Sequence, residues 1–240
     1  MPQKKPRRTS ERILDVTLAM FNRFGEPNVS TSQLCAELGI SPGNLFYHHP
    51  TRDALIEGLF HRYRSQVESI QITLEPGEGA LLPPRAGLSP QMATLAELCR
   101  DIAQAAWAHK FLFRDLNDLV ARQRVLEDEM PALLRRQAAL LQGQVQALPW
   151  VAPGPREAWT RLWVGPMLAS LTHSMGLDGA LDPRERLRPT GTQAVERAVW
   201  RALGLLLSAL PPAEGQALEQ HLSRGEALGP DPWWLSSSGG

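Results

Sequence analysis

Two adjacent histidines, His48 and His49, are the residues with the clearest potential for metal binding or acid–base chemistry. Neighbouring residues on a helix point about 100° apart, so this pair does not converge easily on one metal ion. The next histidine, His61, lies too far along the chain for the HExxH spacing of zinc enzymes. No GxSxG sequence, Walker loop or Rossmann glycine pattern is present. The sequence therefore predicts no catalytic residues and no metal site.

Signals for helix starts and ends surround these histidines. The segment Ser30–Gln33 has the S-x-x-Q form of a capping box, and Gly39 ends the short helix that follows it. The segment Ser41–His48 begins with a serine followed by proline, which is typical of a helix start, and Pro50 ends it. Two short capped helices joined by a tight turn with glycine predict a helix-turn-helix.

Longer helices flank this pair. Thr9 and Ser10 are predicted to cap a first helix that ends near Phe24, and Thr51 to cap a fourth that ends near Ile70. Residues 73–90 are rich in Pro and Gly and read as a linker. No segment shows the alternation of apolar and polar residues that is typical of β-strands, so the predicted fold class is all-α. Six further helices are predicted over Ser89–His109, Phe111–Val120, Val125–Leu148, Arg156–Met175, Thr192–Leu210 and Ala213–Ser223.

Composition narrows the function classes. The chain has 240 residues and a formal net charge of zero, but residues 1–64 carry nine Lys and Arg against six Asp and Glu. The basic arm at residues 4–12 is weak evidence for an anionic partner such as DNA, and a solvated tail is the plain alternative. Two cysteines, Cys35 and Cys99, no signal peptide and no long apolar run predict a cytoplasmic protein outside membranes.

Three stretches of the first 65 residues, RILDVTLAMFNRFG, VSTSQLCAELGISPGNLFYHH and TRDALIEGLF, resemble the DNA-binding domain of the TetR family of bacterial transcriptional regulators. The match is strong over about a quarter of the chain, and the remainder is similar in helical layout. More narrowly, FNRFGEPNVST, ISPGNLFYH and WAHKFLFRDLNDL resemble a branch that includes regulators of polyhydroxyalkanoate gene clusters.

The chain departs from the family pattern at three positions. Cys35 stands where alanine is usual, and free cysteine packs as a small hydrophobe. Phe46 stands where tyrosine is usual, so a hydroxyl that often reaches a phosphate is missing. His49 stands where phenylalanine is usual. A polar ring at a normally buried position needs a partner, so we expect local rearrangement or partial exposure at this residue.

The resemblance implies that the second short helix enters the major groove and contacts base edges. Asn44 suits a base edge or phosphate, and Thr31 and Ser32 lie at the positive end of the first short helix, where a phosphate binds. Taken singly, Tyr47 is better explained as a packed surface aromatic, His48 as a cation at a helix end and Arg52 as a solvated charge. Inside a matched helix-turn-helix the preference reverses. The expected DNA-binding residues are Thr31, Ser32, Pro42, Gly43, Asn44, Phe46, Tyr47, His48 and Arg52.

We expect three segments: a basic arm with the helix-turn-helix over residues 1–50, a helical regulatory and dimerisation domain over 51–225, and a tail over 226–240. The family would place a homodimer interface on the last two long helices, although their apolar stripe also fits intrachain core. That stripe consists of Trp163, Met167, Leu171, Val199, Leu203 and Leu206.

Large apolar side chains in the middle of the chain suit solid core, which is the default at helical spacing, or a pocket for a small apolar effector such as a fatty acid or an acyl thioester. No cofactor is predicted. The resulting hypothesis is a sequence-specific repressor that binds a palindromic duplex as a homodimer and is released by its effector. The alternatives are a helical enzyme and a structural adaptor. The candidate ligand residues are Trp107, Phe111, Phe113, Trp163, Met167 and His173.

Overall fold

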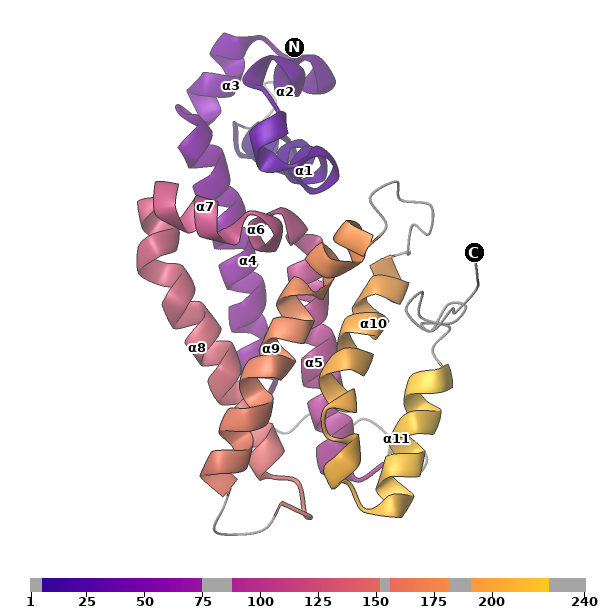
Figure 1. Cartoon of the computed structure of the whole chain (residues 1–240). Coiled ribbons are helices and arrows are strands. Elements are labelled where there is room, and N and C mark those ends of the chain that lie inside the picture. The colour runs from indigo at the N-terminus through magenta and orange to yellow at the C-terminus, as the bar shows by residue number, and fades with distance from the viewer. Residues whose placement is uncertain (1–5, 75–87, 152–155, 182–190, 225–240) are drawn as a thin grey trace. The chain divides into compact units, whose positions relative to one another are not determined.

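A computed structural model of the chain describes residues 6–74, 88–151, 156–181 and 191–224. Every regular element in these ranges is a helix, as the sequence predicts (Figure 1). The chain divides into two compact units, an N-terminal unit formed by residues 1–68 and 108–134, and a C-terminal unit formed by residues 69–107 and 135–240. The N-terminal unit therefore extends beyond the sequence-based boundary at residue 50 and includes a later segment of the chain.

The N-terminal unit is built around an amphipathic first helix. Ile13, Thr17 and Phe21 recur at helical spacing on α1 and are buried, and they pack with the two short helices and the start of α4. Tyr63, one of the largest fully buried side chains, extends this core along α4. The helices of this unit are α1 (Pro6–Phe24), the 3₁₀ turn η1 (Glu26–Asn28), α2 (Thr31–Leu38), α3 (Pro42–His48), α4 (Arg52–Leu74, through Glu68), α6 (Lys110–Arg114), α7 (Leu116–Arg122) and the start of α8 (Arg124–Gln146).

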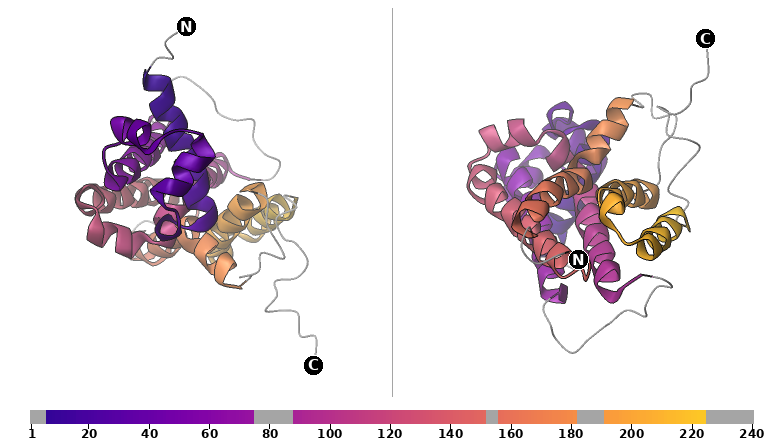
Figure 2. Two further views of the ribbon diagram at one scale, coloured as in Figure 1. Left: turned by 90° about the horizontal axis from the view of Figure 1, so that it is seen from above. Right: turned by 60° about the horizontal axis from the view of Figure 1, so that its bottom comes forward.

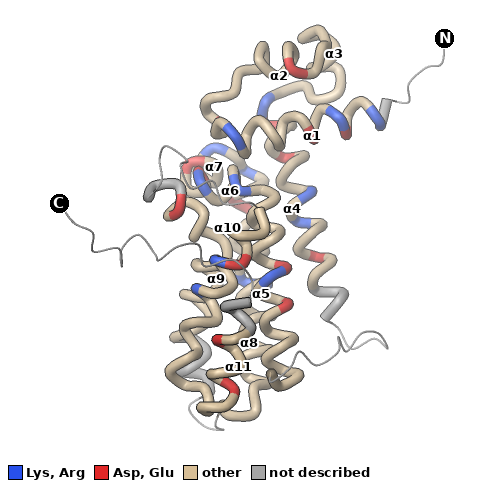
Figure 3. The backbone as a smooth tube through the Cα atoms, turned by 90° about the vertical axis from the view of Figure 1, so that its right-hand side faces the viewer, with Lys and Arg blue, Asp and Glu red and all other residues tan. Residues whose placement is uncertain are grey.

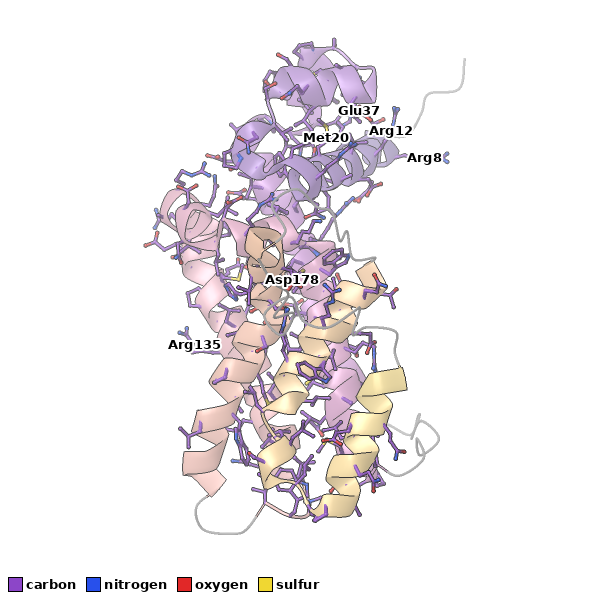
Figure 4. The ribbon with its side chains drawn as sticks, turned by 45° about the vertical axis from the view of Figure 1, so that its right-hand side comes forward. Arg8, Arg12, Met20, Glu37, Arg135 and Asp178 are labelled. Atoms are coloured by element: carbon purple, nitrogen blue, oxygen red, sulfur yellow. The ribbon has the colours of Figure 1, made fainter. Side chains whose placement is uncertain are left out.

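In the C-terminal unit, α9 and α10 lie side by side, and α11 lies beside α10 (Figures 1 and 2). Ion pairs tie these helices together. Arg100 on α5 donates to Glu196 on α10 at 2.7 Å, and Arg201 on α10 donates to Asp178 on α9 at 2.5 Å. Figure 4 labels Asp178 on α9. The helices are α5 (Pro90–Ala108), the rest of α8, α9 (Arg156–Leu181), α10 (Gly191–Gly204), the 3₁₀ turn η2 (Leu207–Ala209) and α11 (Pro212–Arg224).

Several of the predicted helix bounds are wrong. The fourth helix ends at Leu74 rather than near Ile70, α9 ends at Leu181 rather than Met175, and α10 ends at Gly204 rather than Leu210. The first helix begins at Pro6, not at Thr9 or Ser10, because proline fits the first position of a helix, where its missing N–H costs nothing. The predicted helix over Phe111–Val120 is two short helices, since the backbone of Asp115 departs from helical geometry between them. The basic residues Lys4 and Lys5 and the tail with Trp233 and Trp234 lie outside the described residues.

Candidate nucleic-acid interface

Local hydrogen bonds fix the two short helices as the sequence predicts. The capping box at the start of α2 is confirmed: Gln33 N donates to Ser30 Oγ at 3.2 Å, and Ser30 N donates to Gln33 Oε1 at 2.8 Å. Gly39 ends α2 with a φ of 63°, a left-handed conformation that glycine adopts without strain. At the start of α3, Asn44 N donates to Ser41 Oγ at 3.2 Å. These caps place α3 at a defined angle after a short turn.

The buried and exposed faces of α3 separate cleanly. Leu45 is completely buried and holds α3 against the unit. Pro42, Gly43 and Asn44 are exposed. Tyr47, near the end of the same helix, is 76 % exposed. The structure thus presents the whole N-terminal half of α3 to solvent, which is the part of a recognition helix that reaches base edges.

Aromatic rings extend this exposed surface toward the end of α3. Phe46 is 43 % exposed. The ring of Tyr47 meets the ring of the half-buried His48 edge-on, with centroids 5.1 Å apart, and this contact orients the tyrosine. At the start of α2, Thr31 is half-buried and Ser32 is exposed beside the free N–H groups of the first turn. These expected DNA-contact residues therefore all have surface available to a ligand.

The helix pair carries almost no charge. Residues 30–51 contain a single Asp, Glu, Lys or Arg, which is Glu37, and the tube of α2 and α3 in Figure 3 is correspondingly tan elsewhere. Arg8 and Arg12 on α1 are basic residues close in sequence to α2 and α3, but they differ in role. Arg8 points away from α1, whereas Arg12 lies toward α2 and donates to the backbone oxygen of Leu38 at 2.8 Å (Figure 4). Arg12 therefore supports the end of α2.

Arg52 is not the exposed cation that the sequence predicts. Its Nε donates to Glu26 Oε1 at 2.5 Å, and its Nη atoms donate to the backbone oxygens of Val29 and Glu26. The guanidinium also lies over the ring of Phe21, 5.2 Å from its centroid. Because its charge is neutralised and its donors are engaged, Arg52 fixes the turn before α2 to the start of α4, and its expected phosphate contact is the weakest of the set.

Glu26 is the residue of this region that sequence reasoning missed. It is 1 % exposed, and its second carboxylate oxygen accepts from Arg122 Nη2 of α7 at 2.8 Å. The next residue of the chain, Gln123, donates to Asp53 at 2.6 Å. A buried carboxylate requires such partners, because an uncompensated charge in the interior is costly. Nothing in the local pattern GEPN indicates that a glutamate there is buried or that its partner lies 96 residues away.

His49 has the partner that its position requires. The ring is buried at the C-terminal cap of α3, and Nε2 lies 3.1 Å from Ser10 Oγ on α1. Burial is the main cause that lowers the pKa of His49 below its ordinary value, so the ring is neutral at neutral pH. The ring thus has the partner that its position requires, but the expected partial exposure is wrong, and the interaction joins α3 to α1.

Two of the expected ligand residues belong to the N-terminal unit. Phe111 packs against Phe21 with ring centroids 5.4 Å apart, and its backbone N–H donates to Asn22 at 3.1 Å. Phe113 meets Tyr63 edge-on at 5.4 Å. Both rings are buried. They therefore serve as core that seats α6 on α1 and α4.

The other four candidates lie in the C-terminal unit. Met167 is fully buried, and His173 is exposed with Nδ1 2.7 Å from the hydroxyl of Thr172. Trp163 is half-buried and meets Trp150 edge-on, with centroids 6.0 Å apart. Trp107 is half-buried beside Gly191, where a Cβ would lie 2.6 Å from the indole Nε1. The absence of a side chain at residue 191 thus lets this tryptophan lie against the start of α10.

The apolar stripe expected at a dimer interface is largely intrachain core. Met167, Leu171, Val199, Leu203 and Leu206 are all fully buried within the C-terminal unit, because α9 and α10 use these faces to pack against their own unit. A different face of α9 is exposed, with Leu162 at 67 % and Leu177 at 51 %. The exposed positions along it are Leu162, Gly165, Pro166, Ala169, His173, Gly176 and Leu177.

In the part of the chain that the structure describes, no three His, Cys, Asp or Glu side chains are grouped so that they could hold a metal ion. Within those same ranges, no helix combines the length and apolarity needed to cross a bilayer.

Family models match both parts of the sequence. The model described as "Bacterial regulatory proteins, tetR family" matches residues 13–59, which contain α2 and α3. The model described as "Bacterial transcriptional repressor" matches residues 78–149. Among curated proteins, no relative with significant similarity was found.

Solved structures share the fold at low sequence identity. A TetR-family transcriptional regulator from Marinobacter aquaeolei VT8 is 21 % identical, with a TM-score of 0.71 over 90 % of this chain and 98 % of that one. Salmonella enterica GusR is also 21 % identical, with a TM-score of 0.50 over 85 % of this chain and 98 % of its own. At these identities the similarity establishes the fold.

Proposed function

We propose that the chain, which matches TetR-family models over residues 13–59 and 78–149, is a sequence-specific repressor that binds double-stranded DNA through α3. The observation that carries the proposal is the exposed, uncharged N-terminal half of α3, held by capped turns and by the buried Leu45. Side chains without long charged stems approach base edges closely. Asn44 suits adenine, to which an amide can make two hydrogen bonds.

Phosphate contacts would position this helix. The first turn of α2 offers free N–H groups with the hydroxyls of Thr31 and Ser32, and helix N-termini attract anions. The hydroxyl of Tyr47 and the ring of His48 extend the contact at the other end of the reading surface. Arg8, exposed on α1, adds a cation that the helix pair itself lacks.

A homodimer would present two such helices to one palindrome. The exposed face of α9 supports this assembly, because it carries two leucines and several small residues but no Asp, Glu, Lys or Arg. Leu162 and Leu177 lie 15 residues apart, which is about 22 Å along a helix. Glycine and alanine between them let a second helix approach closely. In a two-fold dimer the same face of the partner would cover it.

Release by an effector would follow from a population shift. A ligand that binds better to a dimer whose reading helices do not match successive major grooves, about 34 Å apart, lowers the affinity for DNA. We propose an acyl compound, such as a fatty acid or acyl thioester, in line with the narrower resemblance to polyhydroxyalkanoate regulators. The support within the C-terminal unit is the half-buried Trp107 and Trp163.

The test of DNA binding starts from the whole protein. Duplexes retained by the purified chain from a random pool are sequenced, and binding of the enriched duplex is measured by fluorescence anisotropy from 50 to 300 mM salt. A palindromic consensus with salt-dependent affinity is expected. A helical enzyme or an adaptor would enrich no sequence, and this outcome would overturn the proposal.

The effector is tested separately. A series of fatty acids and acyl thioesters is titrated while tryptophan fluorescence, melting temperature and operator affinity are recorded. A ligand must change all three, because one that binds both states equally shifts no equilibrium. Binding without a change in operator affinity would remove the acyl effector but leave the DNA-binding proposal standing.

A further inference from the structure

The aromatic ring of Phe46 lies exposed on the reading helix. It follows the fully buried Leu45, so the backbone of α3 directs it outward and leaves 43 % of it in contact with solvent. Three residues earlier on the same face is Gly43. Side chains of a helix lean toward its N-terminus, so the ring leans toward that end of α3 while staying more than 4 Å from a Cβ placed at Gly43.

Gly43 leaves the approach to the ring open. A Cβ at this position would have only Ser41 Oγ near it, at 3.9 Å, so no other atom of the described chain occupies the space. Pro42 and Asn44 on either side are also exposed. A large, rigid ligand surface such as the floor of a groove can therefore reach Phe46 without rearrangement of the helix.

The chemistry of a phenyl ring restricts what it can recognise there. It neither donates nor accepts a hydrogen bond, and the ring is apolar. In the major groove the edges of the bases present hydrogen-bond donors and acceptors, with one apolar exception, the C5 methyl group of thymine. A phenyl ring placed on any other edge would remove water from a polar atom and return no partner to it.

No charge on the helix pair overrides this preference. Glu37 is the only Asp, Glu, Lys or Arg in residues 30–51, so neither Lys nor Arg from this segment can reach guanine. Tyr47 has a hydroxyl and an edge-on contact with His48, which suits it to phosphate or sugar. Phe46 is thus the residue of α3 best suited to an apolar base contact.

We propose that Phe46 determines sequence specificity by packing on a thymine methyl group in each half-site of the bound duplex. The proposal rests on the DNA-binding function proposed above and names the base feature that this helix selects. A contacted methyl group is worth about 0.8 kcal/mol, which corresponds to about fourfold in affinity. Loss of the methyl group in both half-sites of a palindrome is then expected to cost about 15-fold.

The experiment removes only the methyl group. In the duplex enriched by the full-length protein, each thymine is replaced by uracil, first singly and then in symmetric pairs, and dissociation constants are measured at constant salt. Uracil keeps every hydrogen bond of thymine. For the wild-type protein we expect one symmetric pair of positions at which uracil weakens binding about 15-fold, with smaller changes elsewhere.

Variants assign the effect to the ring. Phe46→Ala is expected to bind the thymine duplex more weakly and to lose the difference between thymine and uracil. Phe46→Leu keeps an apolar side chain and retains part of the difference, whereas Tyr47→Ala weakens binding but keeps the full difference. Circular dichroism and melting temperature check that each variant is folded, as expected for an exposed ring.

Each contrary result has a distinct meaning. A wild-type protein that is insensitive to uracil at every position overturns the role of Phe46 while DNA binding stands. An unchanged uracil penalty in Phe46→Ala assigns the methyl contact to another residue and also overturns it. A failure to enrich any duplex overturns the proposed function itself, and with it this inference.

Discussion

Two helices of this protein expose uncharged faces, and the two faces differ in kind. α3 shows an amide, a glycine and two aromatic rings, Phe46 and Tyr47. α9 shows Leu162 and Leu177 with small residues between them. The first face offers hydrogen bonds and flat rings over a few residues, and the second offers an extended aliphatic surface that a backbone can approach.

The difference indicates different partners. A groove of DNA presents polar edges with scattered methyl groups, so a surface that reads it needs hydrogen bonding beside limited apolar area. A second copy of the same helix presents no fixed pattern of donors, and close packing of small and branched side chains suffices. Exposure alone does not distinguish these partners, but the size and chemistry of the side chains do.

The largest expected effect tests whether the buried apolar stripe of α9 and α10 is core and not interface. Leu203→Arg places a charge at a fully buried position of α10, so we expect it to destabilise the C-terminal unit by more than about 4 kcal/mol. Urea denaturation followed by circular dichroism measures this loss. A Leu203→Arg variant that stays folded but becomes monomeric would place the dimer interface on the stripe that contains Leu203. It would contradict the proposal that the exposed face of α9 forms the interface.

The next effect concerns the support behind α3. Glu26→Ala leaves the guanidinium of Arg52 without its carboxylate partner, and we expect a loss of about 3 kcal/mol in unfolding free energy. The value lies at the lower end for broken buried pairs because both arginines keep some contact with water. Asp118→Ala, which removes an exposed partner of Arg122, is the matched control and should cost less than about 0.5 kcal/mol. Equal effects of both variants would contradict the structural role of Glu26.

Leu162→Arg tests the α9 face without disturbing the core. Because a two-fold interface contains the substitution twice, dimer dissociation is expected to become about 100-fold easier while the melting curve of the monomer is retained. Sedimentation equilibrium measures it. Ala139→Arg, at an exposed position of α8, serves as the control and should leave the dimer intact. Dimerisation that is indifferent to Leu162→Arg would place the interface elsewhere.

Tyr47→Ala tests the α3 face in the same way. Its ring is largely exposed, so the melting temperature should stay the same, while affinity for the enriched duplex falls about tenfold. Phe24→Ala removes another exposed ring, on which Arg23 stacks at the end of α1, and should leave DNA binding unchanged. Comparable losses of DNA affinity in both variants would mean that the position of Tyr47 on α3 does not matter for binding.

The smallest effect concerns His49, the buried histidine at the end of α3. The pKa of His49 is lowered in the folded state, so its contribution to stability is present above its ordinary value of 6.5 and is lost as pH falls through the folded pKa. His49→Phe should therefore become more stable than wild type below pH 6.5, by at most about 1.4 kcal/mol per pH unit. Thermal melts from pH 5 to 8 measure it. A constant difference across this range would show that His49 does not titrate with unfolding.

Caps and helix limits were predictable from short stretches of sequence. Ser30 and Gln33 satisfy each other's backbone groups, Gly39 supplies a left-handed residue, and Ser41 with Pro42 starts α3, and each of these depends on residues at most four apart. The exposed reading surface of α3 followed from the same spacing. No comparable local signal identifies a ligand pocket, because large apolar side chains suit every part of a helical core.

The sequence by itself thus determined an all-α chain with the capped helix pair α2 and α3. Only the tertiary structure decided that Arg52 is held by Glu26, that Leu203 is core, and that Leu162 marks the exposed face of α9. The reason is physical. Helix ends are fixed by hydrogen bonds between near neighbours, whereas burial and ion pairing depend on which distant segments meet, and helical periodicity shows an apolar stripe without showing what covers it.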